Sequence, residues 1–256
     1  MDRSIVVILP GTLDTSRNIV RYLRDLDIEI KMIPILRVKI NRDEIKAAQK
    51  IFSSGFTPDV SIFTSKTAVK IVKKLIPVAW RCAKKYSIAI GPGTASLIRK
   101  LGGLEVKHPQ EHSSEGLMKY LINFPESIRL AAYCSSEVNM SLENFLKEYF
   151  KDVCLWKLYT LSEETASVKE IVDLVGTSAG RTYLIVITSL KILKIISREV
   201  DLLTKYGNVF FSAISKRLAR EASRLGLKIN HLSSTNNIIE YYNELRQYIE
   251  NLLRHS

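Results

Sequence analysis

The stretch from residue 87 to residue 102 constrains the fold most, because it has the pattern of a strand, a turn and a helix in direct succession. Ser-Ile-Ala-Ile at 87–90 is typical of a buried strand. Gly-Pro-Gly at 91–93 permits a tight turn. Thr94 occupies the position expected for a helix N-cap, and Gly102 is placed to end that helix.

A helix N-terminus behind an open turn can bind an anion through its free backbone N–H groups. We therefore take the turn, with Gly91 and Thr94, as a candidate binding element. The same pattern also occurs in ordinary strand–helix units of α/β domains, so this turn alone does not decide the function.

The alternation of strands and helices continues along the chain. Predicted strands include residues 5–9, 59–65, 128–134 and 182–187, and each precedes a predicted helix. Short, wholly apolar strands of this kind are typical of parallel sheets buried on both faces. We predict an α/β fold with parallel β-sheets flanked by helices.

An internal similarity indicates two related lobes. Phe63-Thr64-Ser65 and Ile187-Thr188-Ser189 both stand directly before a predicted helix. The turn of residues 90–95 has a counterpart at 214–219, and each is followed by a glycine at the same spacing, Gly102 and Gly226. Hydroxyl groups therefore gather after strands, where ligands bind in open α/β sheets. We expect two similar lobes with a cleft between them.

Composition limits the partners. The chain of 256 residues has a formal net charge of +12, with its lysines and arginines spread along its length. This charge favours acidic ligands, although dispersed basic residues are also typical of an ordinary solvated surface. Nothing in the sequence approaches the ~20 apolar residues of a membrane span, and no signal peptide is evident, so we expect no membrane association.

Metal and disulfide chemistry is not indicated. The three cysteines, Cys82, Cys134 and Cys154, lie far apart and form no CxxC motif, which fits a reducing, cytoplasmic location. His108 and His112 have a helical metal-ligand spacing, but Pro109 lies between them. No metal site is predicted.

The common catalytic and nucleotide-binding motifs are also missing. The sequence contains no GxGxxG, no P-loop and no G-x-S-x-G elbow. What remains is a set of hydroxyls, turn N–H groups and cations, which can hold and position an anion.

The order and spacing of several short motifs resemble the uroporphyrinogen-III synthase family over nearly the whole chain. These motifs lie at residues 59–69, 90–95, 113–117, 158–160 and 187–189, followed by the turn at Gly226. The sequence departs from the family in two places. Residues 9–12 lack the arginine usual after the first strand, and Ser215-Lys216-Arg217-Leu218 replaces a Gly-Pro-Thr-Thr turn.

The resemblance implies a particular division of the chain. One lobe would combine residues 1–33 and 162–256, and residues 39–154 would form the other. Residues 34–38 and 155–161 would be two antiparallel crossing strands that join the lobes. The resemblance also implies a monomer that uses no cofactor.

The implied reaction is the cyclisation of hydroxymethylbilane, a linear tetrapyrrole with eight carboxylates, to uroporphyrinogen III. Water is lost, and the last pyrrole ring is inverted through a spiro intermediate. The enzyme must therefore fold a flexible polyanion so that the inverting attack is nearer, which is a positioning task.

The resemblance makes Tyr159 the candidate catalytic acid, because it matches the family's Tyr-x-Thr position at the end of the second crossing strand. A phenol stays protonated at neutral pH and can donate to the departing hydroxyl. The alternative is a tyrosine that only packs at the linker. The candidate substrate contacts are hydroxyls, turn groups and one cation: Thr64, Ser65, Gly91, Thr94, Ser135, Ser136, Thr188, Ser189 and Lys216. The hydroxyls can equally be helix caps, and Lys216 and Arg217 can equally be exposed helix charges.

Two other function classes stay open. A protein with this fold could bind an anion or a tetrapyrrole without turnover. Nucleic-acid binding is not expected, because the sequence has no recognisable motif, dense basic stripe or aromatic stacking platform. A transient contact with the enzyme that makes hydroxymethylbilane is a further expectation.

Overall fold

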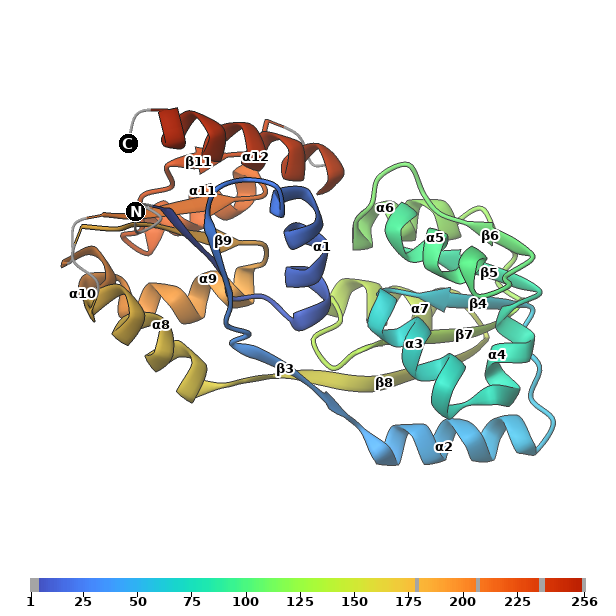
Figure 1. The fold of residues 1–256 in the computed structure, drawn as a ribbon. Helices are drawn as coiled ribbons and strands as arrows, with labels where there is room; N and C mark the ends of the chain where they lie inside the picture. Colours follow the sequence, from blue (N-terminus) through green and yellow to red (C-terminus); the bar gives the residue numbers. More distant parts are fainter. Residues whose placement is uncertain (1–4, 178–179, 206–207, 235–237, 255–256) are drawn as a thin grey trace. The chain divides into compact units, whose positions relative to one another are not determined.

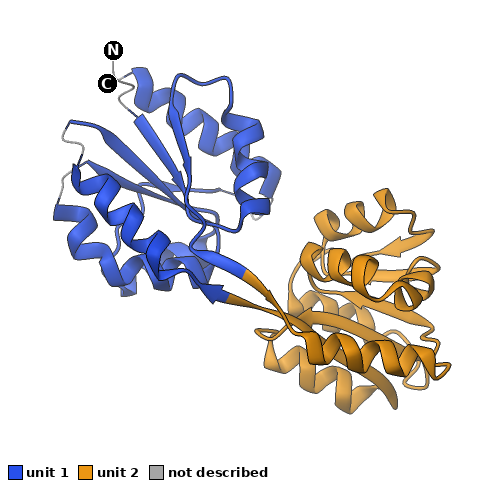
Figure 2. Ribbon diagram, turned by 60° about the horizontal axis from the view of Figure 1, so that its bottom comes forward, with its two compact units in different colours: residues 1–37, 162–256 blue, residues 38–161 orange. Residues whose placement is uncertain are grey.

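The computed structural model describes residues 5–177, 180–205, 208–234 and 238–254 (Figure 1). The chain divides into two compact units, coloured separately in Figure 2. Unit 1 comprises residues 1–37 and 162–256, and unit 2 comprises residues 38–161.

Unit 1 is built on a five-stranded sheet. Its strands are β1 (Ile5–Leu9), β2 (Glu29–Met32), β9 (Thr182–Ile187), β10 (Val209–Ala213) and β11 (His231–Leu232). They lie in the order β11-β10-β9-β1-β2, and all neighbouring pairs are parallel. Every residue of β1 is buried, because a central strand of a parallel sheet is covered on both faces.

The helices of unit 1 are α1 (Leu13–Leu23), α8 (Thr165–Thr177), α9 (Leu190–Ile196), α10 (Val200–Lys205), α11 (Lys216–Arg224) and α12 (Ile238–Arg254), with a short 3₁₀ turn, η1 (Ser197–Glu199). Apolar side chains of α1 and α12 form one core cluster with β1 and β9. Helix α9 packs against β9, and α11 packs against β10.

Unit 2 is built on a six-stranded sheet. Its strands are β3 (Leu36–Ile40), β4 (Val60–Phe63), β5 (Tyr86–Ala89), β6 (Glu105–Lys107), β7 (Arg129–Ser135) and β8 (Asp152–Glu163), in the order β3-β8-β7-β4-β5-β6. The five strands from β8 to β6 are parallel.

Strand β3 runs antiparallel to β8. The Asn41 N–H donates to the Leu158 carbonyl, and the Glu164 N–H donates to the Ile35 carbonyl. Residue numbers thus rise along one strand as they fall along the other. Both strands cross the boundary between the two units, which lies after residue 37 and after residue 161.

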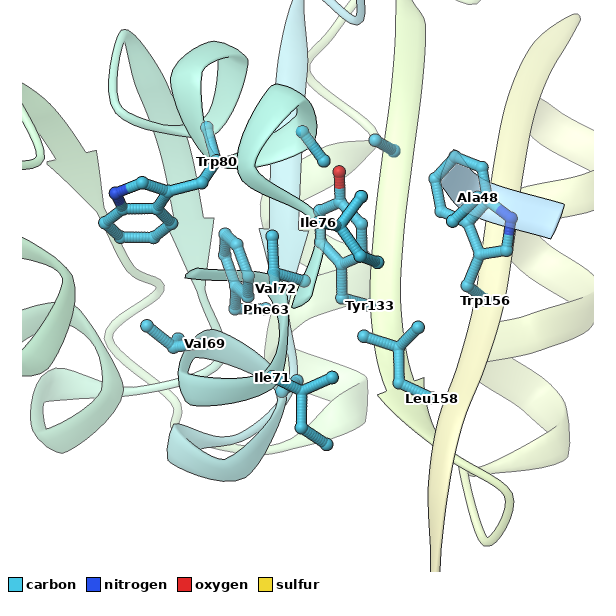
Figure 3. Packing of buried hydrophobic residues seen from close by; sticks show 14 of the residues in the cluster. Ala48, Phe63, Val69, Ile71, Val72, Ile76, Trp80, Tyr133, Trp156 and Leu158 are labelled. Atoms are coloured by element: carbon cyan, nitrogen blue, oxygen red, sulfur yellow. The ribbon is translucent and has the colours of Figure 1, made fainter. Parts of the chain in front are cut away.

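Helices cover both faces of the sheet of unit 2. They are α2 (Arg42–Ser53), α3 (Lys66–Leu75), α4 (Pro77–Ala83), α5 (Pro92–Lys100), α6 (Ser114–Leu121) and α7 (Met140–Tyr149). Helices α2 to α5 contribute to one core cluster and α6 and α7 to the other. In the first cluster, Tyr133 stacks between Phe63 and Trp156, with ring centroids 4.9 and 5.5 Å away (Figure 3).

The predicted α/β class with parallel sheets and flanking helices is confirmed. No helix in the described ranges is long and apolar enough to cross a membrane. Helices α4 and α8 were not predicted. Pro77 at the first turn of α4 and the i, i+3, i+7 spacing of Val168, Ile171 and Val175 in α8 are signals that could have indicated them.

Candidate functional site

The candidate residues of unit 2 lie at one edge of its sheet. Strands β7, β4 and β5 are parallel neighbours, so their carboxyl ends meet at the same edge. Thr64 and Ser65 follow β4, and Gly91 lies two residues after β5. Ser135 is the last residue of β7, and Ser136 follows it.

Ser65 is the N-cap of α3. Its hydroxyl accepts a hydrogen bond from the Ala68 N–H at 3.0 Å, which satisfies one of the free donors of the first turn. Thr64 is tied to the neighbouring strand, because both its N–H and its hydroxyl donate to the Tyr133 carbonyl. The Thr64 hydroxyl is thus bound to the backbone of β7, whereas the Ser65 hydroxyl also contacts the side chain of Tyr159.

A β-bulge directs Tyr159 toward Ser65. Cys134 pairs with Lys157, but Ser135 pairs with Tyr159, so β8 contains one extra residue at this point. Successive side chains of a strand point to opposite faces, and the extra residue reverses that alternation. Leu158 and Tyr159 consequently both join the core cluster beneath α3.

The Tyr159 hydroxyl lies within a group of hydroxyls. It donates to the Ser65 Oγ at 2.9 Å, and the hydroxyls of Thr67 and Ser135 lie close enough to lower its pKa. Burial raises the pKa of Tyr159 above its usual value, and the hydrogen bonds from these hydroxyls offset part of that rise. The phenol therefore holds its proton at neutral pH. Thr67 was missed from the sequence, although it lies only two residues after Ser65.

The Ser136 N–H donates to the Tyr159 carbonyl at 2.7 Å and fixes the backbone beside the phenol. The Ser136 side chain is exposed at the edge, and that of Ser135 is half-buried. The structure therefore brings Tyr159, Ser65 and Ser135 together, with Ser136 next to them.

The expected role of Thr94 as a helix N-cap is wrong. Helix α5 begins at Pro92, and Gly91 is its N-cap, with φ −168°. Proline is favoured at the first helical position because its fixed φ suits the helix and its missing N–H is not needed there. Thr94 is instead in the first turn, with its N–H donating to the Gly91 carbonyl, and it is buried.

Helices α3 and α5 both present N-termini without acidic residues. Their first turns contain no Asp or Glu, and neither does that of the short helix α4, whereas α2, α6 and α7 in the same unit carry acidic residues there. An acidic side chain would neutralise the partial positive charge of the helix end. Its absence from α3 and α5 leaves both ends suited to an external anion.

The remaining candidates belong to unit 1. Ser189 is the N-cap of α9 and accepts from the Ile192 N–H at 3.3 Å, and half-buried Thr188 precedes it. Lys216 is exposed at the first position of α11, and Ser215 caps that helix. The serine hydroxyl thus takes the capping position where the family turn has glycine.

No group of three or more His, Cys, Asp or Glu residues in the described part of the chain could hold a metal ion. The rings of His108 and His112 lie 5.5 Å apart, centroid to centroid. His108 Nδ1 is hydrogen-bonded to the Pro109 carbonyl.

The chain matches the family model described as uroporphyrinogen-III synthase HemD over residues 17–239. Its fold is similar to a mutant uroporphyrinogen III synthase from the extremely thermophilic bacterium Thermus thermophilus, with a TM-score of 0.63, 14% identity and coverage of 98% of this chain and 99% of the other. It is also similar to the uroporphyrinogen-III synthetase of Helicobacter pylori, with a TM-score of 0.58, 11% identity and coverage of 95% and 98%.

A search of curated proteins finds no match. The sequence identities to the solved structures are low, so the structural similarity establishes the fold only. The family model covers most of the chain and establishes family membership. The chain therefore belongs to the uroporphyrinogen-III synthase family, whose members are cyclising lyases of tetrapyrrole biosynthesis.

Proposed function

We propose that this chain carries out the family reaction on hydroxymethylbilane with Tyr159 as the proton donor. The observation that carries this assignment is the position of the Tyr159 hydroxyl. It lies at the carboxyl edge of the sheet of unit 2, donates to Ser65 and has a raised pKa. Ligands of open α/β sheets bind at this edge.

The chemical step needs one proton. As the bond between the terminal methylene carbon and its hydroxyl breaks, the Tyr159 proton passes to the departing oxygen, and water leaves. The electron-rich pyrrole stabilises the resulting cation. Attack by the substituted carbon of the last ring then gives the spiro intermediate, and reopening and closure invert that ring. Release of a pyrrole-carbon proton restores the phenol, so the protein is unchanged.

The proton transfer requires an exchange of hydrogen bonds. Tyr159 donates to the Ser65 Oγ in the present structure, and it must donate to the substrate hydroxyl in the reacting complex. Ser65 keeps its bond from the Ala68 N–H throughout. Ser65 is therefore a positioning residue that holds the phenol in place until substrate arrives.

The proposed substrate contacts are hydroxyls, backbone N–H groups at helix N-termini and one lysine. In unit 2, Gly91, Thr94, Ser135 and Ser136 would contact carboxylates near the N-termini of α3 and α5. In unit 1, the corresponding contacts would be Thr188, Ser189 and Lys216. A protein of net charge +12 attracts a polycarboxylate from solution. We also propose a cytoplasmic location and a transient contact with the enzyme that makes the unstable substrate.

A product assay tests the proposal. Purified protein is added to fresh hydroxymethylbilane, and the oxidised products are separated into isomers I and III. Isomer III in proportion to protein concentration supports the proposal. Isomer I alone, from protein with a cooperative melting transition, contradicts it and favours a binding protein of the same fold.

A further inference from the structure

The turn after β7 is bound to β8 at the two residues that follow Tyr159. Glu137 lies in this turn, and its side chain is exposed. One oxygen of its carboxylate, Oε1, accepts from the Thr160 hydroxyl at 2.9 Å and from the Leu161 N–H at 3.1 Å. A side chain of the turn therefore fixes the backbone of β8 beyond the phenol.

The Glu137 carboxylate replaces a backbone acceptor of the sheet. The ladder between β7 and β8 ends with the pair of Ser135 and Tyr159, and the Ser136 N–H donates to the Tyr159 carbonyl. In a regular parallel ladder, the N–H two residues further along β8 would donate to the next carbonyl of β7. Because β7 ends at Ser135, the Leu161 N–H donates to Glu137 instead. The carboxylate thus continues the pairing of β8 beyond the end of its neighbour.

This extra pairing lies where the strand most needs it. The bulge interrupts the regular ladder at Tyr159, and the direction of a strand side chain follows from the backbone that carries it. Leu161 is the last residue of unit 2, after which β8 continues into unit 1. The bonds to Glu137 therefore fix the end of the segment that directs the phenol toward Ser65.

The charge of Glu137 also acts on the phenol. Burial raises the pKa of Tyr159, and the negative charge of Glu137 raises it further. The hydroxyls of Ser65, Thr67 and Ser135, which carry no charge, lower it. The carboxylate thus helps to keep the proton on the phenol.

We propose that Glu137 is a positioning residue for the proton donor, and that its carboxylate sets the place of the Tyr159 hydroxyl by binding Thr160 and Leu161. The role of Tyr159 as donor rests on the proposed function, whereas the effect of Glu137 on the phenol requires no substrate. Glu137 neither gives nor takes a proton in the reaction.

The test compares Glu137→Ala and Glu137→Gln with the control Asp59→Asn. Asp59 is also an exposed carboxylate that accepts from a backbone N–H, that of Arg129 at 2.9 Å, but it lies before β4, at the opposite edge of the sheet. Glu137→Ala should lower kcat for isomer III formation about tenfold, because proton transfer depends steeply on the position of the donor. Glu137→Gln keeps an acceptor oxygen and should recover most of this loss at neutral pH. Asp59→Asn should keep kcat within about twofold.

Binding should be separable from the chemical step. KM for hydroxymethylbilane, and Kd measured by fluorescence for uroporphyrin III, a stable octacarboxylate, should not rise by more than about twofold in Glu137→Ala. In the Tyr159→Phe background, Glu137→Ala should add little to the loss of kcat, because the hydroxyl that it positions is already gone.

The pH dependence provides a measurement that a purely structural role would not change. Glu137→Gln removes the negative charge that raises the pKa of Tyr159. The phenol should then lose its proton at a lower pH than in the wild type, and the decline of kcat at basic pH should begin at a lower pH. Without substrate, ultraviolet difference spectra between each protein and its Tyr159→Phe counterpart follow the ionisation of this one tyrosine. Asp59→Asn should leave that ionisation unchanged.

A wild-type kcat in Glu137→Ala protein that melts cooperatively would overturn the proposal. An equal loss of kcat in Asp59→Asn would also overturn it, since the effect would then be one of general stability. Full additivity of Glu137→Ala and Tyr159→Phe would show that the two residues act independently. An unchanged ionisation of Tyr159 in Glu137→Gln would show that the carboxylate does not act on the phenol.

The outcomes separate this proposal from the proposed function. If the wild type makes no isomer III but Glu137→Gln lowers the pH at which Tyr159 ionises, the effect of Glu137 on the phenol stands and the synthase activity fails. If isomer III forms and Glu137→Ala keeps the wild-type kcat, only the positioning role fails.

Discussion

Replacing Tyr159 with phenylalanine removes one hydroxyl and keeps the ring that packs beneath α3. The lost bond is a neutral one to the Ser65 Oγ at 2.9 Å, worth about 1 kcal/mol in unfolding free energy. Ser65 still accepts from the Ala68 N–H, so the start of α3 is retained. For a chain of this length the melting temperature should fall by only about 2–4 °C.

The Tyr159→Phe substitution should affect kcat far more strongly than it affects stability. General acid assistance is typically worth roughly 10²–10⁴-fold. Pyrroles expel water readily, so we expect a loss near the lower end, about 10²-fold in kcat. The assay is the initial rate of isomer III formation from fresh hydroxymethylbilane, with KM determined in the same series. KM should change little, because the phenol is assigned to the chemical step.

Tyr149→Phe provides the matched control. The Tyr149 hydroxyl donates to the Ile122 carbonyl at 2.9 Å, on α7 in the same unit. This variant loses a comparable hydrogen bond but should keep its kcat. A Tyr159→Phe protein that melts normally and turns over at the wild-type rate would refute the assignment of Tyr159 as the acid.

Three further predictions follow from named contacts. Gly116→Ala should lower the free energy of unfolding by about 3 kcal/mol or more in denaturant titrations, because its methyl group would clash with the Glu111 carbonyl oxygen; a change below 1 kcal/mol would contradict this. Ser65→Ala should cost about 1 kcal/mol through the lost cap and also slow isomer III formation by loosening Tyr159; an unchanged kcat would argue against positioning. Burial lowers the pKa of His231 below that of an unfolded histidine, roughly 6.5, so the unfolded state binds protons first as the pH falls. The stability contribution of neutral His231 is therefore complete above about pH 6.5 and is lost as the pH falls through the pKa of the folded state. In His231→Gln the urea concentration at the unfolding midpoint should depend less on pH between pH 7 and 5 than it does in the wild type.

Local features of this fold could be predicted from the sequence. The apolar run of β1 is wholly buried, as a central parallel strand should be. Gly102 ends α5 and Gly226 ends α11, and both adopt the left-handed backbone conformation, with φ angles of +92° and +75°. Each of these features depends on a few adjacent residues, so short patterns carry enough information.

Features that depend on long-range pairing could not be predicted. The bulge that directs Tyr159 toward Ser65 arises from the register between β7 and β8, which local sequence does not determine. The N-cap of α5 was placed at Thr94 because threonine is a common cap, but the proline at the first helical position outweighed that preference.

The position of Lys66 also required the structure. In the sequence it is one lysine among many in a basic chain. Only the packing of α3 beside α5 brings its ammonium to the turn at Gly93. Charge composition predicts an acidic ligand, and three-dimensional contacts are needed to show which cations lie near the candidate site.

The ratio of isomer III to isomer I under single-turnover conditions tests the central claim most directly. With protein in excess over fresh hydroxymethylbilane, closure with inversion should outpace the uncatalysed reaction and give almost only isomer III. The Tyr159→Phe protein should shift the ratio toward isomer I, because slower catalysis leaves more substrate to close without inversion. A wild-type ratio equal to that of the blank, from protein that binds uroporphyrin III and melts cooperatively, would contradict the account.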